Sequence, residues 1–368
     1  MINKTKSHKN GIIAIDFFCG MGGMTRGLLD AGIKVKKGYD IESNLKDTYE
    51  KNNKGAKFIC KSVLELTAKE VLEGIDRENN YLLLAGCAPC QPFSNINRKK
   101  DKNDKRNYLL LEFGRLIDEI DPDFVLMENV PGLKNGQGKP IFKKFENILK
   151  KNKYLFSSDI FDAKDYGVPQ RRRRLTLLAS KKGEINLPEA THGKNKQDFV
   201  TVRDTLKKYP KISAGKKHNK IPNHECRSLS EINKLRLKHI RKNGGSREEL
   251  PTKLKLKCHD KHSGHGDVYG RMKWDTFAPT LTCKCTSISN GRFGHPTQTR
   301  GISLREAAAL QTFKDEYKIY GNLTEATRWV GNAVPVMFLK MFAKQIVKHK
   351  EMLDYGIYNI TKRGNKSF

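Results

Sequence analysis

The amino-acid sequence predicts an α/β fold in which a sheet of parallel strands carries helices on both faces. The main observation is that short apolar segments alternate with helix-like segments through the first half of the chain, and repeated strand–helix units of this kind form a parallel sheet. A second observation is a change of composition near Lys181-Lys182-Gly183, where the alternation fades. Because 368 residues exceed what one hydrophobic core usually serves, a second domain is expected after that point.

Short apolar runs predict the strands, because a run bounded by polar or turn residues is typical of a buried strand. The first run, Ile12-Ile13-Ala14-Ile15, meets Asp16 too early to be the apolar region of a signal peptide. In chain order the predicted strands are Gly11–Phe18, Val35–Tyr39, Tyr81–Ala85, Phe124–Met127 and Leu175–Ala179. The segments between and after these strands predict helices at Met24–Ala31, Asn44–Lys51, Leu109–Ile120 and Leu304–Gln311.

The balance of charge predicts a polyanionic partner. The chain carries 71 Lys and Arg against 40 Asp and Glu, a formal net charge of +31, and such an excess favours nucleic acid over a basic surface kept for solubility. About half of the excess falls in Thr191–Arg300, which holds 25 Lys and Arg, 9 Asp and Glu and eight of the ten histidines. This segment is therefore expected to form a separate basic module.

Composition also indicates where the protein works. Hydrophobic residues make up 37% of the chain and charged residues 30%, which fits a globular protein with a very polar surface. The eight cysteines occur without a secretory signal, which predicts reduced thiols in a cytoplasmic protein. No stretch approaches the roughly 18 apolar residues that a membrane helix needs, so no membrane partner is expected.

A glycine-rich loop, Asp16-Phe17-Phe18-Cys19-Gly20-Met21-Gly22-Gly23, joins the first predicted strand to the first predicted helix. Glycines let the backbone turn tightly and approach a ligand, and the helix start offers N–H groups. The loop lacks the Gly-x-Gly-x-x-Gly spacing, so a dinucleotide is not the first candidate, and an ordinary turn stays open as an alternative. Asp40 ends the next strand, where a carboxylate can accept hydrogen bonds from ribose hydroxyls.

The turn Ala88-Pro89-Cys90-Gln91-Pro92 follows the predicted strand Tyr81–Ala85, and ligands bind at the carboxyl ends of strands in open α/β sheets. This position makes Cys90 a candidate covalent nucleophile. Cys87 and Cys90 also form a Cys-x-x-Cys pair, so a redox dithiol is an alternative, although a proline interrupts the helix that such a pair expects. A nucleophilic thiol needs basic neighbours that favour the thiolate, and Arg171–Arg174 are candidates.

Two further charged groups lie next to predicted strands. The run Arg171–Arg174 enters a strand, so alternation sends Arg172 and Arg174 to the same face, with a solvated charged patch as the alternative. Glu128 ends another strand, where its carboxylate is expected either to serve a ligand or to cap a turn.

Six segments, taken together, identify a family. They are Asp16–Gly23, Pro89-Cys90-Gln91, Glu128-Asn129-Val130, Gln170–Arg174, Arg305–Phe313 and Gly331–Pro335. With these segments in this order, the chain resembles the DNA cytosine-5 methyltransferase family of bacterial restriction–modification systems. One motif alone would be weak, but six in family order are specific, and they span nearly the whole chain outside the basic module.

The resemblance implies the fold of an S-adenosylmethionine-dependent methyltransferase: a Rossmann-like mixed sheet with helices on both faces, plus a smaller basic target-recognition domain. Residues 1–187 and 328–368 would form the cofactor-binding and catalytic domain and residues 188–327 the recognition domain, with DNA in the cleft between them. Asp267–Met272 and Ser289–Pro296 fit the family's recognition module. Lys and Arg there would hold phosphates, while other polar side chains would contact base edges in the major groove.

The resemblance also assigns S-adenosylmethionine to the glycine-rich loop, with Asp40 on its ribose and Asn332 joining the carboxyl-terminal segment to the cofactor domain. The residues expected to bind the cofactor are Asp16, Phe18, Gly20, Gly22, Gly23, Asp40, Ile41, Pro89, Leu109, Asn332 and Val334. Two departures from the family pattern stand out. Cys60-Lys61-Ser62-Val63 lacks the acid that members often place at the adenine amine, and Phe313 is followed by Lys314 instead of proline.

For catalysis the resemblance implies a covalent mechanism. Cys90 would attack C6 of cytosine, while Glu128 would hold the exocyclic amine and N3. Arg172 and Arg174 would bind near the base and its phosphate and support the thiolate. The base must first flip out of the duplex. The segment Asn95–Asn107, with six Lys and Arg against two Asp, is expected to close over it, or else to be a plain solvated loop.

No metal is expected. A group of residues in the basic module raises the question of zinc, but its spacing lacks paired Cys-x-x-Cys units. These residues are Cys258, His259, His262, His265, Cys283 and Cys285.

Two other functions stay open. The first is a tRNA cytosine-5 methyltransferase; those relatives usually show Pro-Pro-Cys-Gln-Pro-Phe-Thr and a shorter module, whereas Ala88 and Ser94 here favour DNA. The second is a catalytically silent DNA-binding homologue, which would be expected to lack Cys90 or Glu128. The favoured interpretation is a monomeric enzyme on double-stranded DNA at the bacterial nucleoid, with a cognate restriction endonuclease acting separately.

Overall fold

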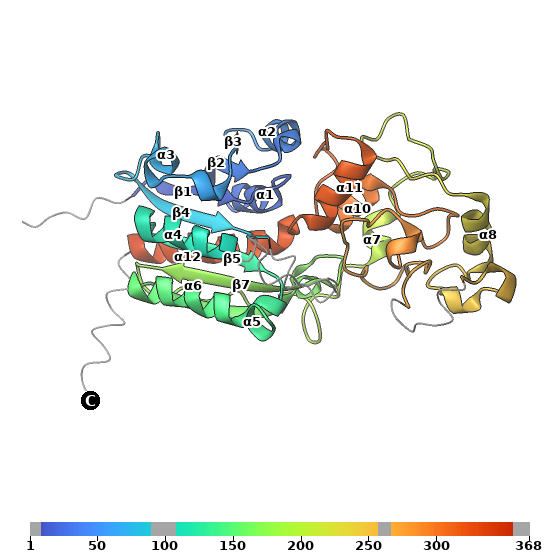
Figure 1. The fold of residues 1–368 in the computed structure, drawn as a ribbon. Coiled ribbons are helices and arrows are strands. Elements are labelled where there is room, and N and C mark those ends of the chain that lie inside the picture. Colours follow the sequence, from blue (N-terminus) through green and yellow to red (C-terminus); the bar gives the residue numbers. More distant parts are fainter. Residues whose placement is uncertain (1–8, 90–107, 257–265, 356–368) are drawn as a thin grey trace, which may run out of the picture. The chain divides into compact units, whose positions relative to one another are not determined.

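The computed structural model describes residues 9–89, 108–256 and 266–355 (Figure 1). Contacts divide the chain into two compact units. The first comprises residues 1–161, 173–189 and 339–368, and the second comprises residues 162–172 and 190–338. Cys90 and the segment 95–107 lie outside the described residues.

The first unit is built on a seven-stranded sheet in the order β3-β2-β1-β4-β5-β7-β6. The strands are β1 (Gly11–Phe17), β2 (Lys34–Asp40), β3 (Lys57–Cys60), β4 (Asn80–Gly86), β5 (Phe124–Asn129), β6 (Leu155–Asp162) and β7 (Arg173–Ser180). Strands β1 to β5 pair in parallel, whereas β7 runs antiparallel to β5. The sheet is therefore mixed, as the family resemblance implied.

The strand–helix alternation predicted a parallel sheet, and this prediction is wrong for β7, which pairs antiparallel with β5. Only residues 163–172 separate β6 from β7, and within them lies a single short 3-10 helix, Ala163–Tyr166. A parallel connection needs a longer crossover, usually a helix, so the chain turns back instead. This reversal brings Glu128 of β5 opposite Thr176 of β7.

Helices cover both faces of this sheet (Figure 1). They are α1 (Gly23–Asp30), α2 (Lys46–Asn52), α3 (Ala68–Leu72), α4 (Leu109–Ile120), α5 (Gly132–Asn135), α6 (Lys139–Lys151) and α12 (Val336–Asp354), whose residues from 339 onward belong to this unit. On one face Phe113 of α4 packs between Phe17 of β1 and Phe145 of α6. On the other face His349 of α12 meets the Phe124 ring edge-on. The predicted α/β class is thus confirmed.

The second unit contains α7 (Val202–Leu206), α8 (Glu231–His239), α10 (Leu304–Leu310) and α11 (Leu323–Asn332). A small apolar cluster around Leu237, Val268 and Ile288 forms one part of its core. Elsewhere the interior is charged: Arg300 and Glu306 are almost completely buried and face each other. Ser303 begins α10 with a capping box in which Glu306 completes the second hydrogen bond.

Candidate active site at the carboxyl ends of the strands

The order of strands reverses direction between β1 and β4, which creates a switch point at their carboxyl ends. Phe17 and Gly86 are register partners and the last residues of these two strands. The glycine-rich loop and the Ala88-Pro89 turn therefore leave the sheet side by side. This is where ligands bind in open α/β sheets.

The glycine-rich loop is shaped by left-handed backbone at Phe18, Gly20 and Gly22, with φ values of 58°, 51° and 91°. Glycine adopts this conformation without a steric cost, which explains two of the three positions. Gly22 then precedes α1, whose first turn starts at Gly23. Hydrogen bonds fasten the loop to β2, since the Gly20 amide donates to Oδ2 of Asp40 at 2.9 Å.

Asp16 lies beneath this loop and is 1% exposed. Its Oδ2 accepts hydrogen bonds from Thr25, from the amide at 3.1 Å and from Oγ1 at 2.6 Å. Burial raises the pKa of Asp16 from 3.8 to about 7 despite these bonds, and the charge of Asp40 adds to the effect. Thr25 Oγ1 also lies 2.8 Å from the Tyr49 hydroxyl, so a polar chain crosses the interior beneath the loop.

Tyr49 reaches this chain only because β2 carries a glycine beside it. A Cβ atom at Gly38 would lie 2.2 Å from the Tyr49 hydroxyl oxygen, which is closer than a Cβ atom comes to a non-bonded atom in real proteins. Tyr49 itself is fully buried. Gly38 thus supplies the space through which the hydroxyl approaches Thr25.

Asp40 presents its carboxylate at the carboxyl end of β2. Gly20 and Glu42 donate backbone hydrogen bonds to it, the latter to Oδ1 at 3.1 Å. Burial raises the pKa of Asp40 in spite of these donors. The next residue, Ile41, is 74% exposed, so an acceptor and an apolar surface stand next to each other. Leu109, the first residue of α4, and Pro89 are both half-buried in the same unit.

Glu128 lies near the end of β5 and is 1% exposed. Nε of Arg174 lies 2.9 Å from its Oε1, forming an ion pair across the β5–β7 strand pair. The thiol of Cys87 donates to its Oε2 at 2.7 Å. Both carboxylate oxygens are thus held by side chains from the two strands or turns that flank β5.

Arg172 behaves differently from Arg174. It belongs to the second unit, is 2% exposed, and donates to the backbone carbonyl oxygens of three residues. The acceptors are Leu281 at 2.8 Å, Gly331 at 3.2 Å and Ala333 at 3.1 Å. The two arginines therefore have separate partners: Arg174 meets a carboxylate, and Arg172 holds backbone segments together.

The Gly331–Pro335 motif is fastened within the second unit. Gln311 donates to the carbonyl oxygens of Val330 and Ala333, and Gln170 donates to Gln311 in turn. Position 331 accepts only glycine, because a Cβ there would lie 2.0 Å from the Thr282 carbonyl oxygen. Asn332 is exposed and Val334 is buried.

Three residues of this site escape the sequence-based prediction. Cys87 contacts Glu128, Thr25 contacts Asp16, and Asn129 donates to the Ala88 carbonyl oxygen at 3.2 Å. In the sequence Asn129 counts only as part of a motif, and Cys87 only as half of a Cys-x-x-Cys pair. The signal for Cys87 is its place one residue beyond Gly86, whose register partner is Met127.

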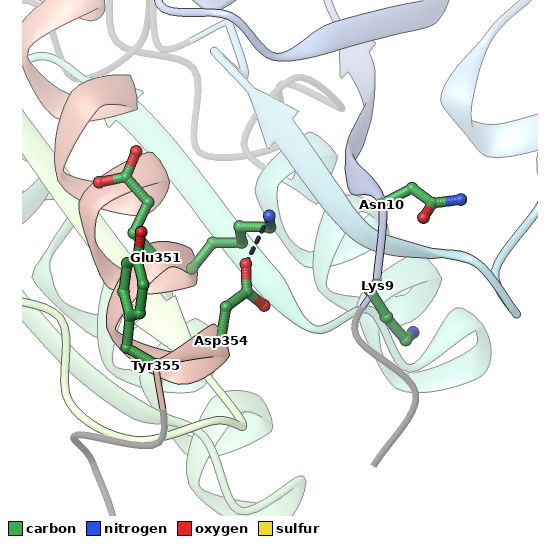
Figure 2. Close-up of a pocket in the computed structure, with 6 residues that line it drawn as sticks. Lys9, Asn10, Glu351, Asp354 and Tyr355 are labelled. Carbon is green, nitrogen blue, oxygen red and sulfur yellow. Dashed lines mark ion pairs between the residues drawn. The ribbon is translucent and has the colours of Figure 1, made fainter. Parts of the chain in front are cut away.

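A pocket of about 460 Å³ lies at the opposite end of β1, before its first residue (Figure 2). It is lined by Lys9, Asn10, Lys350, Glu351, Asp354 and Tyr355. Lys350 pairs with Asp354 at 2.5 Å, so two of its charged groups satisfy each other. None of the predicted catalytic or cofactor-binding residues lines this pocket.

Metal-binding and membrane-spanning features are absent from the part of the chain that the structure describes. There, no group of three or more His, Cys, Asp and Glu side chains is arranged to hold a metal ion. Cys258, His259, His262 and His265 lie outside the described residues. Across 9–89, 108–256 and 266–355, no helix combines the length and the apolar character needed to cross a membrane.

Comparisons with known proteins agree on one group. The model of the family described as C-5 cytosine-specific DNA methylase matches residues 12–348. Type II methylase M.HgiDII of Herpetosiphon aurantiacus is 41% identical over 345 residues, which cover 92% of this chain and 96% of that protein. Type II methyltransferase M1.HphI of Haemophilus parahaemolyticus is 30% identical over 341 residues, covering 91% and 86%.

Solved structures give the same result for the fold. A DNA modification methyltransferase encoded within an E. coli prophage superposes with a TM-score of 0.72 at 25% identity, covering 92% of this chain and 99% of that chain. The S. pombe Dnmt2 methyltransferase superposes with a TM-score of 0.62 at 17% identity, covering 92% and 99%, which is a likeness of fold alone.

Proposed function

This chain belongs to the C-5 cytosine-specific DNA methylase family, and from that membership we propose its mechanism: S-adenosylmethionine methylates C5 of a cytosine flipped out of a short DNA sequence, through a Cys90–C6 adduct. The enzyme class itself, a DNA (cytosine-5) methyltransferase of the type II kind, is shown by the family match and by relatives that cover nine-tenths of the chain.

One observation carries the proposal: a buried carboxylate lies near the carboxyl end of β5, and a side chain contacts each of its two oxygens. Glu128 is 1% exposed, and Arg174 and Cys87 hold it in one orientation. A carboxylate so placed can accept from the exocyclic amine of cytosine and share a proton with N3. That interaction grows as the ring becomes nucleophilic at C5, which is the condition for catalysis by differential binding.

The covalent step explains why a thiol is needed. C5 of cytosine is a poor nucleophile until C6 is attacked, so bond formation at C6 divides a difficult reaction into two easier steps. Cys90 follows Pro89 in a turn whose described part is fastened to β1, since the Cys87 amide donates to the Phe17 carbonyl oxygen at 3.3 Å. After methyl transfer, loss of the C5 proton and of the Cys90–C6 bond restores the aromatic ring.

The residues present at the switch point fit S-adenosylmethionine, whose sulfonium supplies the electrophilic methyl group when it is bound. Asp40 offers a fixed acceptor to ribose hydroxyls, and the exposed Ile41 offers an apolar surface to the adenine ring. Asp16 carries one carboxylate oxygen, Oδ1, that has no hydrogen-bond partner among the described atoms. The proposed set within the first unit is Asp16, Phe18, Gly20, Gly22, Gly23, Asp40, Ile41, Pro89 and Leu109, while Asn332 and Val334 stay predictions from the resemblance.

The DNA partner is proposed to contact the basic module. Residues 188–327 would form the recognition domain, and the Lys and Arg of Thr191–Arg300 would neutralise phosphates. Arg172 acts here as a positioning residue, because its guanidinium is occupied by backbone carbonyl oxygens. A separately acting restriction endonuclease and a monomeric enzyme complete the proposal.

Methyl transfer from labelled S-adenosylmethionine to duplex DNA, with tRNA as a parallel substrate, tests this function. Bisulfite sequencing of the DNA then locates the modified base. We expect label at C5 of cytosine within one short recurring sequence. Label on tRNA alone would assign the enzyme to RNA, and DNA binding without any label would show a silent homologue.

A further inference from the structure

Cys87, which the sequence presents as one half of a Cys-x-x-Cys pair, touches the carboxylate that the proposed function assigns to the target base. Its Sγ lies 2.7 Å from Oε2 of Glu128, while Nε of Arg174 lies 2.9 Å from Oε1. Because Glu128 is 1% exposed, bulk water does not replace a lost donor easily. We propose that Cys87 is a positioning residue that orients Glu128 for the exocyclic amine and N3 of cytosine, an inference that rests on the proposed function.

The backbone around Cys87 supports this role because it is fixed at several points. Gly86 pairs with Met127, so Cys87 follows directly where Glu128 follows on the neighbouring strand. The Cys87 amide donates to the Phe17 carbonyl oxygen, and Asn129 holds the next carbonyl, that of Ala88. The thiol is therefore presented to Glu128 by strand register and does not depend on a mobile side chain.

A thiol suits this position chemically. A carboxylate has about four acceptor positions on its two oxygens. Cys87 takes one of them on Oε2 by hydrogen bonding, whereas Arg174 lies beside Oε1 as an ion pair. Each oxygen keeps acceptor capacity for the base. A thiol is a weak donor, so it restrains the rotation of the carboxylate without competing strongly with the amine of cytosine. Loss of the donor would leave Glu128 held at one oxygen only.

Two substitutions separate orientation from packing. Cys87→Ala removes the donor, whereas Cys87→Ser keeps one. We expect Cys87→Ala to lower the single-turnover methyl-transfer rate about tenfold or more with unchanged Kd for DNA and for S-adenosylmethionine, and we expect Cys87→Ser to retain most of the rate. Cys283→Ala, which removes an exposed thiol elsewhere, serves as the matched control and should leave the rate unchanged.

A substrate lacking the exocyclic amine tests the orientation directly. Duplexes carrying 5-fluorocytosine or 5-fluoro-2-pyrimidinone both trap the covalent adduct, because C5 has no proton to lose. Cys87→Ala should lower the rate of adduct trapping on both bases. The factor by which it lowers that rate should be about threefold or more smaller on 5-fluoro-2-pyrimidinone than on 5-fluorocytosine, because the pyrimidinone has no amine for Glu128 to contact. A purely structural role would give equal losses on both bases.

The outcomes are distinguishable from failure of the proposed function. Wild-type enzyme that does not modify DNA cytosine overturns the function and this inference together. Active wild-type enzyme with an equally active Cys87→Ala variant, or with equal losses on the two trapping bases, overturns the role of Cys87 alone. A Cys87→Ser variant as slow as Cys87→Ala would also contradict it.

Discussion

Arg300 and Glu306 form a two-pronged ion pair inside the second unit, with both guanidinium nitrogen–carboxylate oxygen distances at 2.7 Å. Their side chains are 0% and 1% exposed. Glu306 also accepts a hydrogen bond of 2.7 Å from the Ser303 amide, as part of the capping box of α10. The glutamate of the Arg305–Phe313 family motif is therefore a structural residue of this unit.

Glu306→Gln should destabilise the second unit strongly, because it leaves the Arg300 guanidinium buried without a counter-charge. Breaking a buried pair of this kind costs about 3–5 kcal/mol. Denaturant unfolding followed by fluorescence measures the change. Glu231→Gln removes an exposed partner of Lys234 and should cost less than about 1 kcal/mol, and equal effects of the two substitutions would contradict the role assigned to burial.

Asp16 should make the stability of the cofactor-free protein fall as pH rises from about 4 to about 7. Burial raises the pKa of Asp16 from 3.8 to about 7, so in that range the folded protein keeps a proton that the unfolded chain has lost. At pH 8 the ionised, buried Asp16 lowers the free energy of unfolding by at most about 4 kcal/mol. Asp16→Asn should remove this slope, and unfolding free energies of both proteins at pH 5 and pH 8 measure it; identical pH dependence would sink the prediction.

Arg174→Lys and Arg172→Lys should fail in different ways. A lysine cannot reproduce the planar geometry of a guanidinium at either position. Arg174→Lys should slow methyl transfer by about a hundredfold with a nearly unchanged Tm, because a lysine keeps the positive charge beside Glu128 but not the guanidinium geometry that orients it. Arg172→Lys should lower Tm first, because three backbone carbonyl oxygens lose their donors. Stopped-flow rates and thermal unfolding, measured on both variants, separate the two effects.

Cys90→Ser should abolish methyl transfer while cofactor binding persists. A serine hydroxyl is far less nucleophilic than a thiolate near neutral pH, so no adduct with C6 forms. Equilibrium binding of S-adenosylmethionine and a methyl-transfer assay report the two properties separately. Retained turnover would remove Cys90 from the role of nucleophile.

DNA binding should weaken steeply with salt. If the basic module neutralises six to ten phosphates, affinity should fall by roughly 10³–10⁵ between about 50 and 200 mM salt, because each contact releases counterions. Fluorescence anisotropy with a labelled duplex at several salt concentrations gives the slope. A shallow dependence would mean that the charge of Thr191–Arg300 serves another purpose.

The central strands of the sheet are predictable from sequence, whereas its edges are not. β1, β4 and β5 are buried runs of Ile, Leu, Val and Phe that stand out as apolar segments. β3 and β6 lie at the two ends of the strand order, and β6 contains only half-buried and exposed residues, without an apolar run. An edge strand has a neighbour on one side only, so its pattern resembles that of a surface loop.

Charged residues of the site are predictable by type but not by partner. Glu128 stands out because it ends an apolar strand, and Arg174 because it lies in a basic run. The contact between them depends on the antiparallel pairing of β5 with β7, which strand–helix alternation does not predict. In the same way, nothing local distinguishes Arg172 from Arg174, although one binds backbone carbonyl oxygens and the other a carboxylate.

The clearance between Gly38 and Tyr49 has a consequence for how the protein can evolve. A methyl group at position 38 would collide with the Tyr49 ring, whose hydroxyl contacts Thr25, which in turn holds Asp16. Gly38→Ala becomes tolerable only after Tyr49 has been exchanged for a shorter side chain, and that exchange removes a hydrogen-bond partner of Thr25. The order in which these two positions can mutate is therefore constrained, because substitution inside strand β2 is limited by a hydroxyl that supports the glycine-rich loop.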